Sequence, residues 1–113
     1  MSECLFCRIV AGDIPATVVH ETDRTLAFRD LNPQAPTHVL VIPKDHHADV
    51  AALAGVDPAY IGQVLAAAVE VVRLEGLTGG HRMVTNTGPD GGQTVGHLHV
   101  HVLGGRAFRW PPG

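Results

Sequence analysis

The sequence has few cysteines, few aromatic residues and no long hydrophobic run. Two cysteines occur in 113 residues, and phenylalanine, tryptophan and tyrosine together make up 4% of the chain. The longest apolar-rich stretch, residues 60–74, is interrupted by Glu70 and Arg73 and is too short to span a bilayer. The first residues lack the basic segment and apolar run of a signal peptide. We therefore expect a soluble, cytoplasmic protein with no membrane partner.

Basic residues are also scarce and scattered. Eight lysines and arginines stand against eleven aspartates and glutamates, and the formal net charge is -3 with histidine neutral. A long nucleic acid needs a concentrated basic face, so we expect no such partner. A single nucleotide needs no such basic face, because backbone N–H groups, hydroxyls and imidazoles can hold its few phosphate oxygens.

The length of the chain limits the size of its core. With 113 residues and 45% hydrophobic content, the chain is long enough for one compact domain and too short for two ordinary ones. We therefore predict a single domain over residues 1–113. Because such a core is modest, we also expect a homodimer that buries further apolar surface.

Two helices are predicted from capping residues and apolar spacing. Ser2 can cap a short helix that runs through residues 5–9 and stops at Gly12. Asp57 offers a capping side chain before Pro58, and apolar residues then recur at helical spacing. This pattern predicts a long helix over residues 58–75.

Five strands are predicted from short segments rich in β-branched or aromatic residues and separated by turn residues. They cover residues 17–21, 25–29, 38–42, 81–87 and 95–103. Strands and helices segregate along the chain instead of alternating strictly. We therefore predict an α+β fold with a five-stranded antiparallel sheet, one long helix and one short helix.

Three histidines alternate with apolar residues in the last predicted strand. Residues two apart share a face of a strand, so His97, His99 and His101 should point one way and the residues between them toward the core. Neighbouring members are roughly 6.6 Å apart and the outer two roughly 13 Å apart, so one tetrahedral zinc can hardly gather all three. A solvated edge strand would not need three imidazoles at strict alternation. Metal binding or catalysis is therefore favoured, with at least one histidine left for chemistry.

Histidine is well suited to attack on phosphorus. Its unperturbed pKa of about 6.5 leaves a neutral, nucleophilic nitrogen at pH 7, whereas lysine is protonated there. A neighbouring imidazolium can neutralise charge on the phosphate oxygens, and a hydrogen bond at Nδ1 can fix the tautomer so that Nε2 attacks.

The run over residues 97–103 resembles the signature of the histidine triad (HIT) family. Further segments extend this resemblance over nearly the whole chain: residues 36–44, Asn86, residues 91–95 and residues 104–113. Together they resemble the histidine triad nucleotide-binding branch. The resemblance implies a dimeric enzyme that hydrolyses purine nucleoside phosphoramidates, or related mixed acyl or sulfuryl nucleotides, through a nucleotidyl-histidine intermediate.

The resemblance also implies a role for each matching residue. His99 matches the nucleophile, and His101 and His38 match histidines that contact the phosphate and support the nucleophile. Asp30 matches the carboxylate that holds the ribose hydroxyls. The apolar walls around the purine are matched by Phe6, Ile9, Phe28 and Leu31, and the phosphate-side loop by Asn86, Gly92, Gln93 and Thr94.

Several of these residues have a simpler interpretation. From the residues alone, Phe6, Ile9 and Phe28 are typical of ordinary core, and Asp30 is equally typical of a turn-capping aspartate. Thr94 stands where serine is commoner in the family. Its hydroxyl is retained for the leaving group, while its extra methyl can alter the rate or the leaving-group preference.

Cys4 and Cys7 have the spacing of metal ligands, but they make only half of a tetrahedral site. Two buried thiols near a terminus are the simpler alternative, and a redox dithiol is disfavoured because only three residues precede Cys4. The resemblance implies that Cys4, Cys7, His46 and His97 hold a structural zinc ion, with His47 as the second choice to His46.

Two other functions remain open. One is hydrolysis of dinucleoside polyphosphates on the same fold, which the ending at residues 110–113 argues against by resemblance only. The other is a zinc-stabilised nucleotide-binding module without turnover, which would retain nucleotide and form no phosphohistidine.

Overall fold

A computed structural model describes residues 3–113 of the chain. In chain order, its elements are α1 (Leu5–Val10), β1 (Val18–Glu21), β2 (Thr25–Arg29), β3 (Thr37–Pro43), α2 (Val50–Val56), α3 (Pro58–Leu74), β4 (His81–Val84) and β5 (Val100–Gly104). The predicted α+β class and five-stranded antiparallel sheet are confirmed. The prediction of only two helices is wrong, because α2 forms behind Asp49, whose carboxylate accepts the N–H of Ala52 at 2.8 Å.

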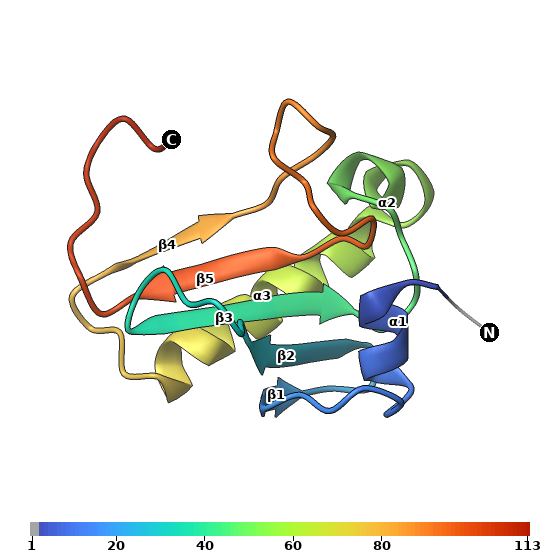
Figure 1. Cartoon of the computed structure of the whole chain (residues 1–113), viewed down its shortest axis with the longest axis horizontal. Coiled ribbons are helices and arrows are strands. Elements are labelled where there is room, and N and C mark those ends of the chain that lie inside the picture. Colours follow the sequence, from blue (N-terminus) through green and yellow to red (C-terminus); the bar gives the residue numbers. More distant parts are fainter. Residues whose placement is uncertain (1–2) are drawn as a thin grey trace.

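The sheet has the order β1-β2-β3-β5-β4, and every neighbouring pair is antiparallel. Figure 1 shows α3 running behind the sheet and α1 lying at the end where β3 finishes. All seven residues of β3 are buried, which is expected for a central strand covered on both faces. No helix in the described part of the chain is long and apolar enough to cross a membrane.

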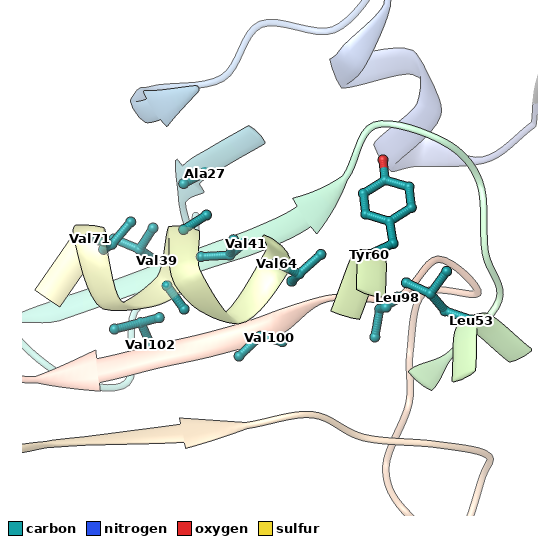
Figure 2. Packing of buried hydrophobic residues seen from close by; sticks show 12 residues of the cluster. Ala27, Val39, Val41, Leu53, Tyr60, Val64, Val71, Leu98, Val100 and Val102 are labelled. Atoms are coloured by element: carbon teal, nitrogen blue, oxygen red, sulfur yellow. The ribbon is translucent and has the colours of Figure 1, made fainter. Parts of the chain in front are cut away.

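One face of the sheet forms the main core with α3. Val39 and Val41 of β3 and Val100 and Val102 of β5 pack against the apolar side of the helix. Figure 2 shows Val64 and Val71 of α3 lying over these strands, with Tyr60, Leu53 and Leu98 at the end nearest α2. Because side chains alternate along a strand, this face takes the odd-numbered residues of β3.

The opposite face carries a second, smaller core beneath α1. Leu26 and Phe28 of β2 and Leu40 and Ile42 of β3 pack there against Phe6. α1 has six residues, so it covers only part of this face. The short helix therefore leaves room for a cavity between itself and the sheet.

Two predicted caps differ from the structure. Ser2 lies outside the described residues, and Cys4 occupies the N-cap of α1, where its Sγ accepts the N–H of Cys7 at 3.4 Å. Asp57 stands at the N-cap of α3 but makes no capping hydrogen bond with its side chain. Its carboxylate instead lies 3.5 Å from Arg24, so an ion pair has displaced the predicted cap.

The last two strands are shorter than predicted. β4 ends at Val84 instead of residue 87, and β5 begins at Val100 instead of residue 95. The segment before β5 leaves the ladder, and Leu98 donates its N–H to His47 O at 2.7 Å. His97 and His99 therefore precede the strand that was predicted to carry them, although the alternation of buried apolar residues continues through Leu98.

Candidate functional site

A cavity of about 240 Å³ lies between α1 and the sheet. Its walls are mostly apolar, with two imidazoles and a carboxylate among them. The lining residues are Leu5, Phe6, Ile9, Ile14, Pro15, Ala16, Phe28, Arg29, Asp30, Leu31, Leu40, Thr94, Val95, His99 and His101. An apolar cavity with a few polar groups is typical of a small-molecule site.

His99 lies in this wall with one ring nitrogen already hydrogen-bonded. The ring is 5% exposed, and its Nδ1 lies 2.8 Å from the backbone oxygen of His97. A carbonyl oxygen only accepts, so Nδ1 carries a proton, and in the neutral tautomer the lone pair is on Nε2. The ring of Phe6 packs edge-on against His99, with 5.1 Å between centroids. The arrangement therefore fixes the orientation of the ring and commits Nδ1 to the backbone, so that Nε2 is the nitrogen left for other contacts.

His101 and His38 form a hydrogen-bonded pair beside His99. His38 Nε2 lies 2.9 Å from His101 Nδ1, and the ring of His101 stands 5.0 Å from that of His99. Burial is the main cause that lowers the pKa of His101 to about 4, with smaller contributions from His99 and His38. Burial also lowers the pKa of His38, against the opposing effect of Asp30.

These pKa shifts correct one expectation from the sequence. An imidazolium beside the nucleophile was expected to neutralise phosphate charge, but with a pKa of about 4 His101 is neutral at pH 7 in the nucleotide-free protein. His38 is buried behind His101 and is not among the lining residues of the cavity. The pair therefore offers neutral hydrogen-bonding groups in place of a cation.

Asp30 caps a turn and also lies in the cavity wall. Its Oδ1 accepts the N–H of Asn32 at 2.8 Å, as a turn-capping aspartate does, and the residue also lines the cavity. Phe6 and Phe28 likewise belong both to the second core and to the cavity wall. Leu31 is 99% exposed and stands at the rim.

The loop before the histidines is held by its own side chains. Asn86 donates to Gly91 O at 2.6 Å, and the amide nitrogen of Gln93 donates to Ala48 O and Val95 O. Asn86, Gly92 and Gln93 are not among the lining residues, whereas Thr94 is. The loop side chains thus place Thr94 at the cavity, and a direct role in nucleotide binding stays a prediction for all four residues.

A second cluster brings together Cys4, Cys7, His46 and His97. Their ligand atoms all lie within 4.8 Å of one another. His97 Nδ1 is 3.4 Å from Cys4 Sγ and 3.5 Å from Cys7 Sγ, and His46 Nδ1 is 3.3 Å from Cys7 Sγ. A tetrahedral zinc with bonds of about 2.1 Å to nitrogen and 2.3 Å to sulfur separates its ligand atoms by roughly 3.3–3.8 Å, so these residues fit the ion.

The buried member of this cluster is held by the backbone. His97 is 0% exposed, and its Nε2 donates to Pro43 O at 2.8 Å, which leaves the lone pair on Nδ1 toward the sulfurs. Burial lowers the pKa of His97, so the ring is neutral as a metal ligand must be. The second-choice ligand, His47, packs its ring against Tyr60 and lies outside the cluster.

Several residues of the site were missed from the sequence. Leu40 and Val95 complete the cavity wall. Leu40 lies two residues after His38 in β3, so strand alternation places both on the same face and could have identified Leu40 from the sequence. Thr85, just beyond β4, donates its hydroxyl to the backbone oxygen of His99 at 3.0 Å. No local pattern distinguishes this threonine from any other exposed residue.

The chain is similar to known proteins over nearly all of its length. The family model described as HIT domain matches residues 11–108. An uncharacterised HIT-like protein of Synechococcus elongatus is 51% identical over the whole of both chains. A 14 kDa zinc-binding protein of Zea mays is 49% identical, covering 99% of this chain and 89% of its own. A HIT family hydrolase of Legionella pneumophila superposes with a TM-score of 0.94 at 49% identity, covering 98% of this chain and 100% of its own.

Proposed function

This chain belongs to the HIT-domain family, and from that premise we propose that it hydrolyses purine nucleoside phosphoramidates through a nucleotidyl intermediate on His99. The observation that carries the proposal is the hydrogen bond from His99 Nδ1 to His97 O. It fixes the neutral tautomer in which Nε2 carries the lone pair, on a ring that lines a cavity. Solved relatives described as HIT family hydrolases support hydrolysis as the class of reaction.

The proposed reaction has two steps. In the first, the lone pair of His99 Nε2 attacks the α-phosphorus, the P–N bond to the amine breaks, and the amine leaves with the bonding electrons and takes up a proton from solvent. In the second, water attacks phosphorus and gives up a proton to solvent, the bond to His99 breaks with its electron pair returning to Nε2, and nucleoside monophosphate is released. Histidine needs no strong base for this attack because its neutral form is already nucleophilic. His101 contacts the non-bridging oxygens, and the hydroxyl of Thr94 faces the leaving group.

The rest of the cavity suits a nucleoside. Phe6, Ile9 and Phe28 offer the apolar surface that a purine ring needs, with Leu31 at the rim. The carboxylate of Asp30 accepts hydrogen bonds from the ribose hydroxyls, since capping Asn32 occupies only one of its oxygens. Asn86, Gly92 and Gln93 support the phosphate side by holding the loop that carries Thr94.

We also propose that Cys4, Cys7, His46 and His97 hold a zinc ion. The fit of their separations to a tetrahedral ion supports this, as does a plant relative described as a zinc-binding protein. Four protein ligands close the coordination sphere, so the ion is structural and ties α1 to the segment before β5. The transfer of the nucleotidyl group uses His99 and His101 without it.

A homodimer is part of the proposal. β4 stands at the edge of the sheet and α3 exposes Leu65 and Val69, so both present surface on which a second copy can pack. Sedimentation at micromolar concentration should show a dimer. A strictly monomeric species across the accessible range would contradict it.

Mass spectrometry tests the central claim directly. The protein is mixed briefly with adenosine phosphoramidate, quenched and digested, and an added adenylyl group is expected on the peptide that contains His99. His99→Asn should show no adduct and should still bind nucleotide. Turnover without any trapped adduct, together with near-normal turnover of the variant, would defeat the covalent mechanism.

A further inference from the structure

We propose that the backbone N–H of Gln34 is a positioning group that fixes the tautomers of His38 and His101, and that Arg106 holds this N–H in place. The catalytic meaning of this inference rests on the proposed function. The assignment of the two tautomers does not rest on it, because the positions of the protons can be measured without substrate.

The direction of the hydrogen-bonded chain follows from its first member. Gln34 N lies 3.0 Å from His38 Nδ1, and a backbone N–H can only donate. Nδ1 of His38 is therefore the acceptor, and since this ring is neutral its proton sits on Nε2. Asp30 Oδ2 is 3.5 Å from that nitrogen, whereas His101 Nδ1 is only 2.9 Å away. The proton of His38 is therefore directed to His101.

The same logic sets the proton of His101. Its Nδ1 accepts from His38, so the single proton of the neutral ring must sit on Nε2. His101 lines the cavity and His38 does not. The ring therefore brings an N–H donor, and not a lone pair, to the phosphate oxygens. With the chain reversed, Nδ1–H of His38 would face the N–H of Gln34, so two donors would meet, and the lone pair of His101 Nε2 would face a negatively charged oxygen.

The loop that presents Gln34 is held from a distant part of the sequence. Nε and Nη2 of Arg106 donate to Gln34 O at 3.1 and 3.0 Å. Gly105, with a φ of +87°, packs so closely that an added Cβ would lie 2.8 Å from Pro36 Cβ. The turn after β5 is therefore fitted to the loop before β3, and the guanidinium fixes the residue whose N–H sets the tautomers.

The wild-type protein gives the first test. Long-range ¹H–¹⁵N correlation spectra at pH 7 should show both His38 and His101 protonated at Nε2 and unprotonated at Nδ1. A proton on Nδ1 of His38 overturns the proposal, whatever the enzyme activity. Absence of phosphoramidate turnover with the expected spectra would instead count against the proposed function alone.

A matched pair of variants tests the donor itself. Gln34→Pro removes the N–H, and Gln34→Ala keeps it while removing the side chain. In Gln34→Pro we expect a mixture of His38 tautomers and a kcat lowered roughly tenfold with little change in KM, the size expected for one hydrogen bond that orients a catalytic group. Gln34→Ala should keep the wild-type tautomers, because its N–H is retained. Unchanged tautomers in Gln34→Pro would overturn the proposal, and if this variant does not fold, the wild-type spectra decide.

Arg106 is tested through the same spectra. Arg106→Met keeps the length of the side chain but loses both donors to Gln34 O, and Arg106→Lys keeps one donor and the charge. We expect partial mixing of the His38 tautomers in Arg106→Met and recovery toward wild type in Arg106→Lys. Identical spectra for Arg106→Met and wild type would remove Arg106 from the proposal.

Discussion

His97 and His99 are two residues apart, yet the structure places them in two different kinds of site. His97 joins the cysteines of the metal cluster, and His99 lines the cavity. The difference lies in which ring nitrogen meets a backbone carbonyl. His97 uses Nε2, toward Pro43 O, and leaves Nδ1 for the sulfurs, whereas His99 uses Nδ1, toward His97 O, and leaves Nε2 for other contacts. A single carbonyl contact thus separates the proposed metal ligand from the proposed nucleophile.

The two regions share α1. Cys4 and Cys7 at the start of this helix reach the metal cluster, while Phe6 and Ile9 form part of the cavity wall. The cluster is closed by four ligand atoms, but the cavity keeps space for a ligand. Disturbing the first should therefore act mainly on stability, and disturbing the second mainly on turnover.

The largest effect is expected from the nucleophile. His99→Asn keeps a polar side chain but removes the attacking nitrogen, so kcat should fall by at least roughly 10³-fold while nucleotide affinity changes little. Steady-state turnover and isothermal titration with AMP give the two readouts. His81→Asn, an exposed histidine of β4, is the matched control. Loss of affinity with the fold intact would mean that His99 serves binding instead.

Loss of a ligand from the metal cluster should lower the stability of the protein. Cys4→Ala removes one ligand and should lower the free energy of unfolding by more than about 3 kcal/mol, seen as a melting temperature lower by roughly 12 °C. At temperatures below the melting temperature of Cys4→Ala, the turnover of this variant should persist. A chelator should destabilise wild type and have no further effect on the variant, because both remove the same ion. Additive effects would contradict a single zinc site, as would the absence of zinc in elemental analysis.

A pH effect of intermediate size is expected from His101. The unfolded chain takes up this proton near pH 6.5, whereas the folded protein resists it until about pH 4. The unfolded state therefore binds more protons in this window, and stability falls as the pH falls, by at most about 3 kcal/mol. Denaturant unfolding should show a shallower decline between these pH values for His101→Gln than for wild type, with His81→Gln as control. Parallel curves would contradict the lowered pKa.

The smallest effect should come from Thr85, which steadies the backbone of the nucleophile. Thr85→Val removes the hydroxyl that donates to His99 O, and loss of this partly exposed hydrogen bond should lower kcat roughly threefold without a change in zinc content. Thr85→Ser keeps the donor and should stay near wild type. A drop of equal size in both variants would indicate packing and not the hydrogen bond.

Sequence reasoning was strongest where a local period carries the information. The apolar spacing behind Pro58 predicted α3 to within one residue at its end. The alternation of histidines with apolar residues correctly separated the core side from the polar side, because it needs only the geometry of an extended chain. The same alternation predicted a β5 that is too long at its start. Pairing continues only where a partner strand runs alongside, and β3 pairs with β5 from Val100 onward.

The sequence by itself determined the α+β class, the family and the set of histidines and cysteines available for chemistry. Only the tertiary structure decided how each ring is used: Nδ1 of His97 toward the sulfurs, a neutral His101, and His38 behind it. The physical reason is that a ring's tautomer and pKa depend on burial and on hydrogen-bond partners. Those partners, such as Pro43 O for His97 and Gln34 N for His38, come from loops that folding brings alongside.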